Sequence, residues 1–530
     1  MKSTCLICLI ASAYSILVAA EDEPFDRGAM SASYWAIWND EIQRKIDNDI
    51  EINRKADARI TLGVPTGTLV TVEQISHAFY FGAHIFNYNQ LGSTEKNAAY
   101  RDLYGTVFNS ATVGFYWPDF EPYPGCLRDR PGFEDSEEYW NSQQEPTTRV
   151  HWRRPATDAP IDWCLSRGVR VHGHPLVWNA GCVPTWLYGQ YMPQEEKDRL
   201  GFPGCPSGLH GRAFSQWHAK VFKPWYRAIT NRYSEVQFAR LAPVFTDNLC
   251  RLQKKRISEI ASRYADRVNS WDVVNESCHG YDSVKGVTSG MPVTYGEHGI
   301  EAGDYVHAAF QTAADVIPEQ ALLNINDWRA DNKYADEIAD LLKAGVRIDA
   351  IGMQMHLFDT NIVREIAQTG GVRTKDGWGS TQFWEIGTLQ QVEARFARYS
   401  RFGKPIHVSE VTISAPGTDC DAQMMQACVA WNLYRAWFAQ KQTSGITWWN
   451  VVDGCGFAGE PTTSGLFSRE MTPKPVFRAL KHLICKRWRT NLFVSADAHG
   501  VVSFRGYRGR YRLTWKDSDG KESVRYFEVK

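Results

Sequence analysis

Residues 268–276 spell Val-Asn-Ser-Trp-Asp-Val-Val-Asn-Glu, a short apolar run that ends in an amide and a carboxylate. Similar runs recur along the chain, and a segment with helical periodicity follows most of them. The eight runs are 79–86, 111–117, 169–178, 268–276, 321–327, 348–356, 405–413 and 445–453. Strands that alternate with helices are typical of parallel βα units. We therefore predict an α/β protein whose residues 79–485 form a closed (β/α)8 barrel.

The segments between these runs supply the helices of such a barrel. Apolar residues recur at helical spacing in 159–167, 254–264, 305–316, 334–343, 389–400, 422–440 and 474–484. A doubly wound open sheet is the alternative topology. It lacks support, because no GxGxxG motif follows the first run.

The start of the chain has the composition of a targeting segment. Lys2 precedes an apolar or small stretch at 5–20, and acidic residues follow at 21–23. We predict that residues 1–20 are a signal peptide, so the mature protein would be secreted, or periplasmic in a bacterium. A membrane anchor is the alternative, but the stretch is shorter than the roughly 20 residues that a span needs.

Two small additions flank the predicted barrel. Residues 21–78 should contain a helix at 34–55 and a β-hairpin that turns at Pro65-Thr66-Gly67. Residues 486–530, with short strands between glycine-rich turns, should form a small β module. The segments 118–158 and 180–215, rich in proline, glycine and cysteine, are predicted to be loops.

The composition excludes some partners and indicates others. The 59 Lys and Arg residues nearly balance the 60 Asp and Glu residues, so a nucleic-acid partner is not expected. Twenty tryptophans suit a protein that stacks rings on the flat apolar faces of sugars. No second stretch is apolar enough to span a membrane, and we expect a monomer. Beyond residue 20 the cysteines number ten, an even count that predicts disulfides in an exported protein, and they form no paired CxxC motif for zinc.

Two glutamates occupy strand positions where carboxylates are uncommon. Glu276 closes the fourth run and Glu410 lies inside the seventh. Strands four and seven stand across a barrel mouth, so both carboxyl groups could face one pocket, where burial and repulsion would keep one protonated. Such a pair can cleave a glycosidic bond, one as proton donor and one as nucleophile or base. A single glutamate here would more simply cap a helix or bind an arginine, but two favour a site.

Histidines offer a rival chemistry. His172 and His174 share one strand face, because the side-chain period of a strand is two. With His356 and His407 they raise the possibility of a metal hydrolase. His407, three residues before Glu410, should however point to the opposite face, and no Lys or Asp is placed to complete a ligand set. We expect no metal and no other cofactor.

Adjacent tryptophans should have different roles. Trp448 and Trp449 point to opposite faces of one strand, so one belongs to the core and only the other can floor a sugar site. Trp271 should be core. In the C-terminal module we expect Trp515, Tyr507 and Tyr511 to pack its interior.

At these residues the chain resembles glycoside hydrolase family 10, the retaining endo-β-1,4-xylanases. The resemblance covers about residues 79–484 and rests on an ordered set of motifs. These are HGHPLVWN at 172–179, WDVVNE at 271–276, LLNIND at 322–327, IGMQMHL at 351–357, HVSEVTI at 407–413 and GITWWNVVD at 445–453.

The resemblance implies residue roles. Glu276 would be the general acid/base and Glu410 the nucleophile of a double displacement on xylan. Asn275 would hold the sugar 2-hydroxyl, and His174 and Trp178 would line the glycone side. The remaining contacts would come from Gln354 and His356 beside the nucleophile and from Trp449 beneath the reacting sugar.

The chain also departs from the family pattern. The family usually has a Glu-Asn pair and a Lys after strand two, which grip the sugar beyond the cleavage point, whereas this chain has the apolar stretch 111–117. Asn179 stands in place of a His, and Thr412 in place of an Asp that usually partners His356. Two alternatives therefore stay open: the same mechanism on another β-linked glycan such as β-glucan, or a carbohydrate-binding protein without catalysis.

Overall fold

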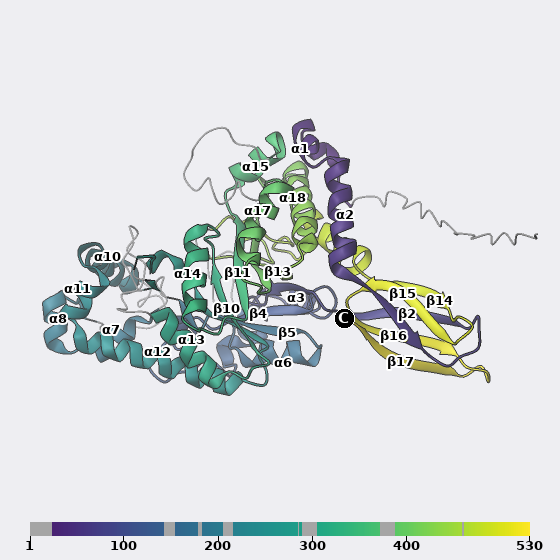
Figure 1. Ribbon diagram of the computed structural model, residues 1–530. Helices are drawn as coiled ribbons and strands as arrows, with labels where there is room; N and C mark the ends of the chain where they lie inside the picture. The colour runs from purple at the N-terminus through teal and green to yellow at the C-terminus, as the bar shows by residue number, and fades with distance from the viewer. Residues whose placement is uncertain are drawn as a thin grey trace, which may run out of the picture.

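The structure is a computed structural model that describes residues 24–142, 154–178, 183–204, 216–284, 286–288, 305–370, 387–457 and 460–530 (Figure 1). The predicted signal peptide at 1–20 lies outside these ranges. Among the helices of the described residues, none combines the length and the apolar character that a bilayer span needs.

The centre of the molecule is a closed parallel barrel, as predicted. In spatial order its strands are β3 (Tyr80–His84), β4 (Ser110–Gly114), β5 (Arg170–His174), β7 (Ser270–Asn275), β10 (Leu322–Asp327), β11 (Ala350–Leu357), β12 (Ile406–Ile413) and β13 (Thr443–Trp448). All neighbouring pairs are parallel, and β13 pairs with β3 to close the ring. The two-residue β6 (Val177–Trp178) extends the ring beside β7.

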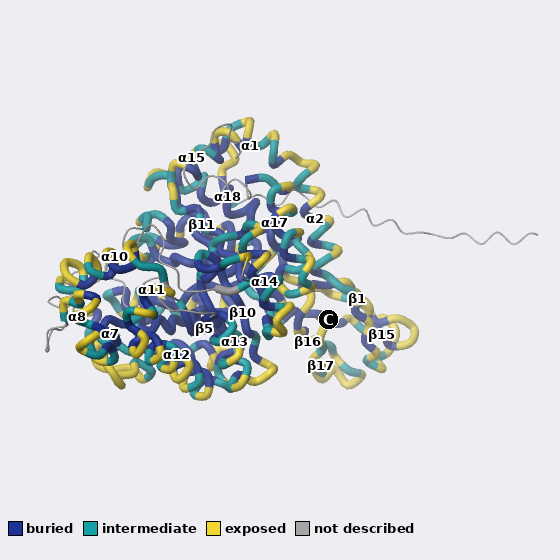
Figure 2. The backbone as a smooth tube through the Cα atoms, turned by 60° about the vertical axis from the view of Figure 1, so that its left-hand side comes forward, coloured by how far each residue is buried: buried dark blue, intermediate teal, exposed yellow. Residues whose placement is uncertain are grey.

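The strands form because both of their faces are covered. Every residue of β4 and of β12 is buried, as expected for parallel strands between barrel interior and helices. Figure 2 shows this buried centre surrounded by more exposed helices.

The surrounding helices begin and end at ordinary signals. They include α3 (Thr94–Arg101), α6 (Asp158–Ser166), α12 (Pro243–Tyr264), α13 (Tyr305–Val316), α14 (Asn332–Lys343), α15 (Thr360–Thr369), α17 (Leu389–Ser400), α18 (Cys420–Ala439) and α19 (Pro475–His482). Asp331 caps α14, and Thr388 with Gln391 forms a capping box at α17.

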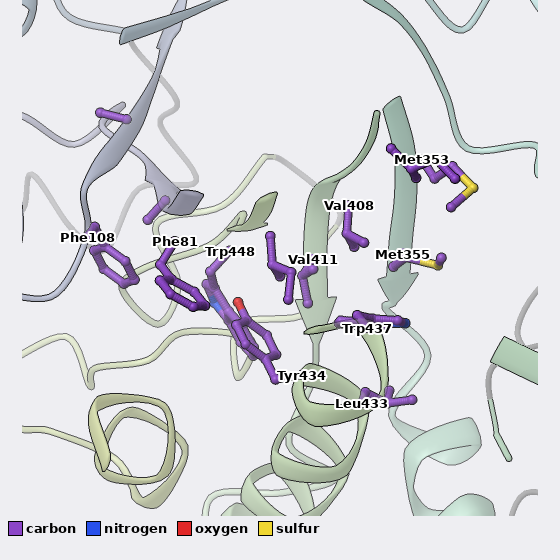
Figure 3. Packing of buried hydrophobic residues seen from close by; sticks show 14 of the residues in the cluster. Phe81, Phe108, Met353, Met355, Val408, Val411, Leu433, Tyr434, Trp437 and Trp448 are labelled. Atoms are coloured by element: carbon purple, nitrogen blue, oxygen red, sulfur yellow. The ribbon is translucent and has the colours of Figure 1, made fainter. Parts of the chain in front are cut away.

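Helix α18 is buried on nearly all sides because it lies between the barrel and an outer helix. Its Leu433, Tyr434 and Trp437 face the barrel-wall residues Val408, Val411 and Trp448 (Figure 3). On its outer side lies α2 (Asp40–Arg54), which follows the short α1 (Ala32–Ile37). The N-terminal helical segment therefore completes the barrel wall.

A helical unit replaces part of the predicted loops. It contains α7 (Thr185–Tyr191), α8 (Gln194–Leu200), α10 (Lys223–Arg232), α11 (Glu235–Leu241) and the first half of α12. The prediction of a loop over 180–215 is wrong for α7 and α8, because Pro184 and Pro193 stand just before these helices, where proline's missing N–H interrupts no helical hydrogen bond. Leu187, Tyr188 and Phe245 pack in a separate apolar cluster that holds the unit together. Short helices α4 (Trp117–Phe120) and α5 (Glu137–Ser142) likewise interrupt the segment predicted as loop at 118–158.

The β unit combines strands from both ends of the chain. β1 (Lys55–Thr61) pairs with β15 (Val501–Tyr507), and β2 (Leu69–His77) lies between β14 (Asn491–Ser495) and β16 (Gly509–Lys516), with β17 (Glu522–Val529) at the edge. Figure 1 shows the purple and yellow strands side by side. The predicted N-terminal hairpin is thus wrong, since alternation identifies a strand and its buried face but not its partner.

The interior of this unit is apolar. Val70, Val72, Val502 and Leu513 are buried between its two sheets. Tyr511 is buried and Trp515 packs against the same cluster, while Tyr507 joins the core of the barrel. The prediction that these aromatic residues pack the interior of the module is therefore confirmed for Tyr511 and Trp515 and wrong for Tyr507.

Six cysteines among the described residues are not joined in disulfides. Cys126, Cys164, Cys278, Cys420, Cys455 and Cys485 are free thiols. Cys164 and Cys278 are buried in the barrel core, where a thiol packs as a small apolar group. Cys182 and Cys205 lie outside the described residues. The disulfides predicted from the even count are therefore absent among these six thiols.

Candidate active site

The strands that carry the two glutamates are both bulged. Along β12, Val408 pairs with Met353 and Glu410 with the next residue, Gln354, so Ser409 is an extra residue. Along β7, the same shift makes Val273 the extra residue. A bulge changes which side chains face inward, and bulges are frequent next to active sites.

The bulge at Ser409 corrects one prediction. His407 does not point to the face opposite Glu410, because the extra residue reverses the alternation between them. Its ring lies inside the barrel, 5.6 Å from the ring of His172, and its Nε2 bonds the hydroxyl of Thr447 at 2.8 Å. His407 therefore lies beneath the candidate site, as a buried packing residue.

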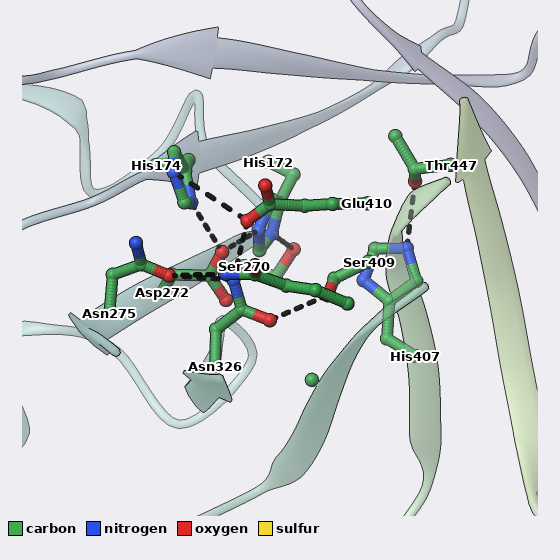
Figure 4. A network of polar contacts seen from close by, with 12 residues as sticks. His172, His174, Ser270, Asp272, Asn275, Asn326, His407, Ser409, Glu410 and Thr447 are labelled. Carbon is green, nitrogen blue, oxygen red and sulfur yellow. Dashed lines mark hydrogen bonds and ion pairs between the residues drawn. The ribbon is translucent and has the colours of Figure 1, made fainter. Parts of the chain in front are cut away.

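Glu410 is buried and surrounded by hydrogen-bond donors (Figure 4). The amide of Asn326 donates to its Oε1 at 2.7 Å, and Nε2 of His356 lies 3.3 Å from its Oε2. Nε2 of His174 lies 3.9 Å from Oε1. These groups favour the ionised form of this carboxyl group.

Glu276 lies at the end of β7 in an unusual backbone conformation. Its φ of 55° is in the left-handed region, which a residue with a Cβ enters at a cost in energy. Its N–H donates to the carbonyl of Asn326 at 2.8 Å, which holds this conformation. The indole of Trp178 donates to Oε2 at 3.1 Å, and the amide of Gln354 donates to Oε1 at 3.1 Å.

One chain of hydrogen bonds joins the two glutamates. Gln354 donates to Glu276 and also, at 3.3 Å, to Oδ1 of Asn275. Asn326 donates to the same Oδ1 at 2.8 Å and to Glu410. These bonds bring Glu276, Asn275, Gln354 and Glu410 together at one place.

Asn326 is a residue that sequence reasoning left out of the site. It was visible only as a polar end of the fifth run. Ser409 donates to its Oδ1 at 2.5 Å and so fixes the direction of its amide. The bridging role depends on the bulge at Ser409, which no pattern in the sequence marks.

Burial and mutual repulsion set the protonation of the pair. Burial, and then the charge of Glu410, raises the pKa of Glu276 to about 7. Burial also raises the pKa of Glu410 to about 7, against the opposing effects of His174 and Asn326. Repulsion acts on both groups alike, so the neighbours decide the order: His174 and Asn326 favour the charge of Glu410, which therefore ionises first, and its charge then keeps Glu276 protonated.

The histidines of β5 are held by a buried aspartate. Oδ2 of Asp272 accepts from Nε2 of His172 at 2.9 Å and from Nδ1 of His174 at 2.7 Å. Burial opposes the charge of Asp272, but the two histidines outweigh it and hold its pKa below the usual range.

This cluster bears on the rival metal chemistry. Among the described residues, His172, His174 and Asp272 form the group whose potential ligand atoms lie within 4.8 Å of one another. His356 and His407, the other members of the predicted set, bond Thr412 and Thr447 instead. The four histidines therefore do not converge on one point, and Asp272 fixes the orientation of His174 beside Glu410.

Thr412 is a partner of His356 after all. Nδ1 of His356 lies 2.9 Å from the hydroxyl of Thr412. The usual Asp is absent, and the hydroxyl of Thr412 takes the place of its carboxylate. Burial lowers the pKa of His356 to about 4, so the imidazole is neutral. If the hydroxyl donates to Nδ1, the proton of Nε2 faces Glu410.

Aromatic rings form one wall of the mouth. Trp449 packs edge-on against His174 at 5.2 Å and against Phe86 at 5.3 Å. Tyr116, after β4, packs edge-on against Trp178 at 5.6 Å. Trp448 and Trp271 are buried in the core, as predicted. Asn179 lies outside the described residues.

The chain is similar to known proteins over much of its length. The family profile described as glycosyl hydrolase family 10 matches residues 134–483. Endo-1,4-beta-xylanase A of Halalkalibacterium halodurans is 27% identical over 324 residues, which are 57% of this chain and 63% of that protein. Endo-1,4-beta-xylanase 3 of Hypocrea jecorina is 26% identical over 277 residues, 50% of this chain and 61% of that protein.

Other relatives are longer, and one has a different name. Endo-1,4-beta-xylanase C of Paenibacillus barcinonensis is 25% identical over 50% of this chain and 24% of its own length, and the exoglucanase XynX of Acetivibrio thermocellus is 22% identical over 61% and 24%. The chain thus spans less than two thirds of each of these relatives. Among solved structures, native xylanase 10B of Thermotoga maritima is similar at 20% identity, with a TM-score of 0.47 over 77% of this chain and 96% of that chain.

Proposed function

The chain belongs to glycosyl hydrolase family 10, and from this premise we propose that it is a retaining endo-1,4-β-xylanase that cleaves internal bonds of xylan. The names of the curated relatives support the substrate. The observation that carries the proposal is the pair formed by the buried Glu410 and the half-buried Glu276, which are joined through Gln354, Asn275 and Asn326. The composition of residues 1–20 supports the further proposal that the enzyme is secreted.

The proposed mechanism has two displacements. Glu410 attacks the anomeric carbon while Glu276 gives its proton to the leaving oxygen, which forms a glycosyl-enzyme and frees the aglycone. Glu276, now ionised, takes a proton from water, and the resulting hydroxide displaces Glu410 with overall retention. The donors around Glu410, with Asn326 at 2.7 Å, favour its ionised form and support this assignment, since the carboxyl group that keeps its proton is the acid.

Neighbouring residues are placed to assist. Oδ1 of Asn275 accepts from Asn326 and from Gln354, so the N–H groups of Asn275 are directed elsewhere and can donate to the 2-hydroxyl of the reacting sugar. We assign Trp449 to the apolar face of that sugar, and His174 and Trp178 to the glycone side. Gln354 and His356 hold the two carboxylates.

The proposal is tested by a reducing-end assay on xylan. We expect turnover by the native protein and none above background by Glu410→Ala. Proton NMR of the first product should show the β anomer, because two inversions restore the configuration. An α anomer, or no activity on any β-linked glycan, would contradict the proposal.

A second candidate keeps the mechanism and changes the glycan. It is favoured by the end of β4, where Phe115, Tyr116 and Trp117 stand in place of the polar residues that the family uses to grip xylan. The name of the exoglucanase relative points the same way. Rates on xylan, arabinoxylan, mixed-linkage glucan and carboxymethylcellulose separate the two candidates, and a higher rate on a glucan would replace xylan as the substrate. Oligosaccharide binding without turnover would instead favour a binding protein.

A further inference from the structure

An arginine covers the aromatic wall beside the candidate site. The guanidinium carbon of Arg154 lies 3.3 Å from the ring centroid of Tyr116 and 5.2 Å from that of Phe86. Tyr116 in turn packs edge-on against His174 at 5.3 Å and against Trp178 at 5.6 Å. Because these last two residues touch the glutamates, Arg154 stands two side chains away from the reacting groups.

Arg154 is held rigidly in this position. Its Nη1 forms an ion pair with Asp119, and its carbonyl accepts from Nη2 of Arg128 at 2.9 Å. Arg128 is itself bound by Asp135 at 2.5 Å and by the carbonyl of Asp119 at 3.0 Å. A planar guanidinium stacked on a ring and paired at one edge has little freedom to move.

The end of β4 is shaped to admit this side chain. A Cβ on Gly114 would lie 2.5 Å from Cδ of Arg154 and 3.2 Å from Phe86, so any larger residue would collide with the arginine. The glycine and the stacked pair therefore form one packed unit, which we call the Arg154 wall and define as Gly114, Tyr116, Phe86 and Arg154.

The side chains of the Arg154 wall are buried by other parts of the protein. Only 1% of Phe86, 5% of Tyr116 and 9% of Arg154 is exposed. One face of Tyr116 is occupied by the guanidinium, so that face is closed to a sugar ring. Asp119 neutralises the arginine, which argues against recognition of an acidic sugar substituent.

We propose that the Arg154 wall closes the glycone side beyond the sugar at Trp449, so that a second glycone sugar gains little binding. The inference rests on the proposed function, because it takes the side of His174 and Trp178 as the glycone side. Substrate affinity then depends on the reacting sugar and on the aglycone side. A longer chain can still be cut if it turns away from the wall after the first glycone sugar.

The test compares two chromogenic substrates. The p-nitrophenyl β-glycosides of xylose and xylobiose differ only by the second glycone sugar. For the native enzyme we expect the ratio of their kcat/KM values to stay below about 10. Arg154→Ala should raise this ratio about five- to tenfold, because it opens the wall. Arg154→Met keeps much of the bulk without the charge and should leave the ratio unchanged.

The variants distinguish a wall from a sugar-gripping residue. If Arg154 bound the second sugar, both substitutions would lower the ratio, and the proposal would be overturned. An unchanged ratio in Arg154→Ala would also overturn it, because the arginine would then be only structural. Thermal unfolding of each variant confirms that the compared enzymes are folded.

A binding measurement makes the result independent of turnover. Titration of Glu276→Gln with xylose and with xylobiose, followed by calorimetry, should give similar Kd values for the two sugars. In Glu276→Gln with Arg154→Ala, xylobiose should bind about five- to tenfold more tightly than xylose. If the native enzyme cleaves no glycan while this difference in Kd holds, the proposed function is wrong and the proposal about the Arg154 wall is supported. Equal affinities for xylose and xylobiose in the double variant would overturn the proposal.

Discussion

Glu276 and Glu410 are the same side chain in two different settings. Glu276 sits at a strand end with positive φ, and the indole and the amide that donate to its carboxyl group are neutral. Glu410 lies within a bulged strand beside Asn326 and the imidazoles of His174 and His356. Burial raises the pKa of both carboxyl groups, and His174 and Asn326 oppose this rise at Glu410. The comparison teaches that the order of ionisation comes from the neighbours.

The largest difference between the two glutamates should appear when the nucleophile is removed. Glu410→Ala should lower kcat on xylan about 10⁴- to 10⁶-fold, because no covalent intermediate can form. Added azide should restore turnover of an activated aryl xyloside and give a product of inverted configuration. Chromatography and NMR check both results, and azide rescue with retention would assign the nucleophile elsewhere.

Removal of the acid should depend on the leaving group. Glu276→Ala should lower kcat/KM on xylan about 10²- to 10⁴-fold, since a sugar leaves only when it is protonated. On a dinitrophenyl glycoside, whose leaving group needs no proton, the first step should be much less affected. Pre-steady-state measurement of the phenolate burst tests this, and equal losses on both substrates would exclude Glu276 as the acid.

Stability offers a comparison that is independent of activity. The pKa of folded Glu276 is about 7 against an ordinary value of 4.5, so the folded state binds the proton more tightly and loses stability as pH rises through this interval. Glu276→Gln removes an ionised buried group and should raise the free energy of unfolding by about 1–2 kcal/mol at pH 8.

The same substitution should have little effect at pH 4, where Glu276 is protonated in both states. Glu410→Gln provides the matched control and should stabilise less at pH 8, because His174 and Asn326 favour the charge of Glu410. Urea unfolding at both pH values is the measurement. If Glu410→Gln raised the free energy of unfolding more than Glu276→Gln does, Glu410 would be the group that keeps its proton, and the two roles would be reversed.

The smallest expected effect concerns Thr412. Thr412→Val removes the hydroxyl on Nδ1 of His356 and frees the ring to turn its proton away from Glu410. We expect kcat to fall about three- to tenfold, the equivalent of one hydrogen bond. Thr412→Ser keeps the hydroxyl and should retain the native rate, whereas equal losses in both variants would point to packing.

The barrel could be predicted because its signal is repeated and local. Each of the eight runs became a strand, and β10 and β12 match their runs within one residue at each end. Buried parallel strands are continuous apolar segments, and their polar ends mark one rim. Glu276 and Glu410 could be singled out because a carboxylate at such a position is uncommon.

What could not be predicted depends on register and on distant segments. The extra residue at Ser409 turns His407 inward, and no composition marks it. Arg154 reaches Tyr116 from another segment, and Asn326 bridges two strands, so neither is visible in a linear pattern. The hairpin prediction failed for the same reason, since β1 and β2 pair with strands more than 400 residues away.

The pairing of N-terminal with C-terminal strands in the β unit has a consequence for folding during synthesis. During synthesis β1 and β2 have no neighbours to complete their ladders until β14, β15 and β16 have been made, more than 400 residues later. Such long-range pairing is slow, and it leaves strand edges open until the partner strands emerge. The β unit should therefore close only after all eight barrel strands have been synthesised.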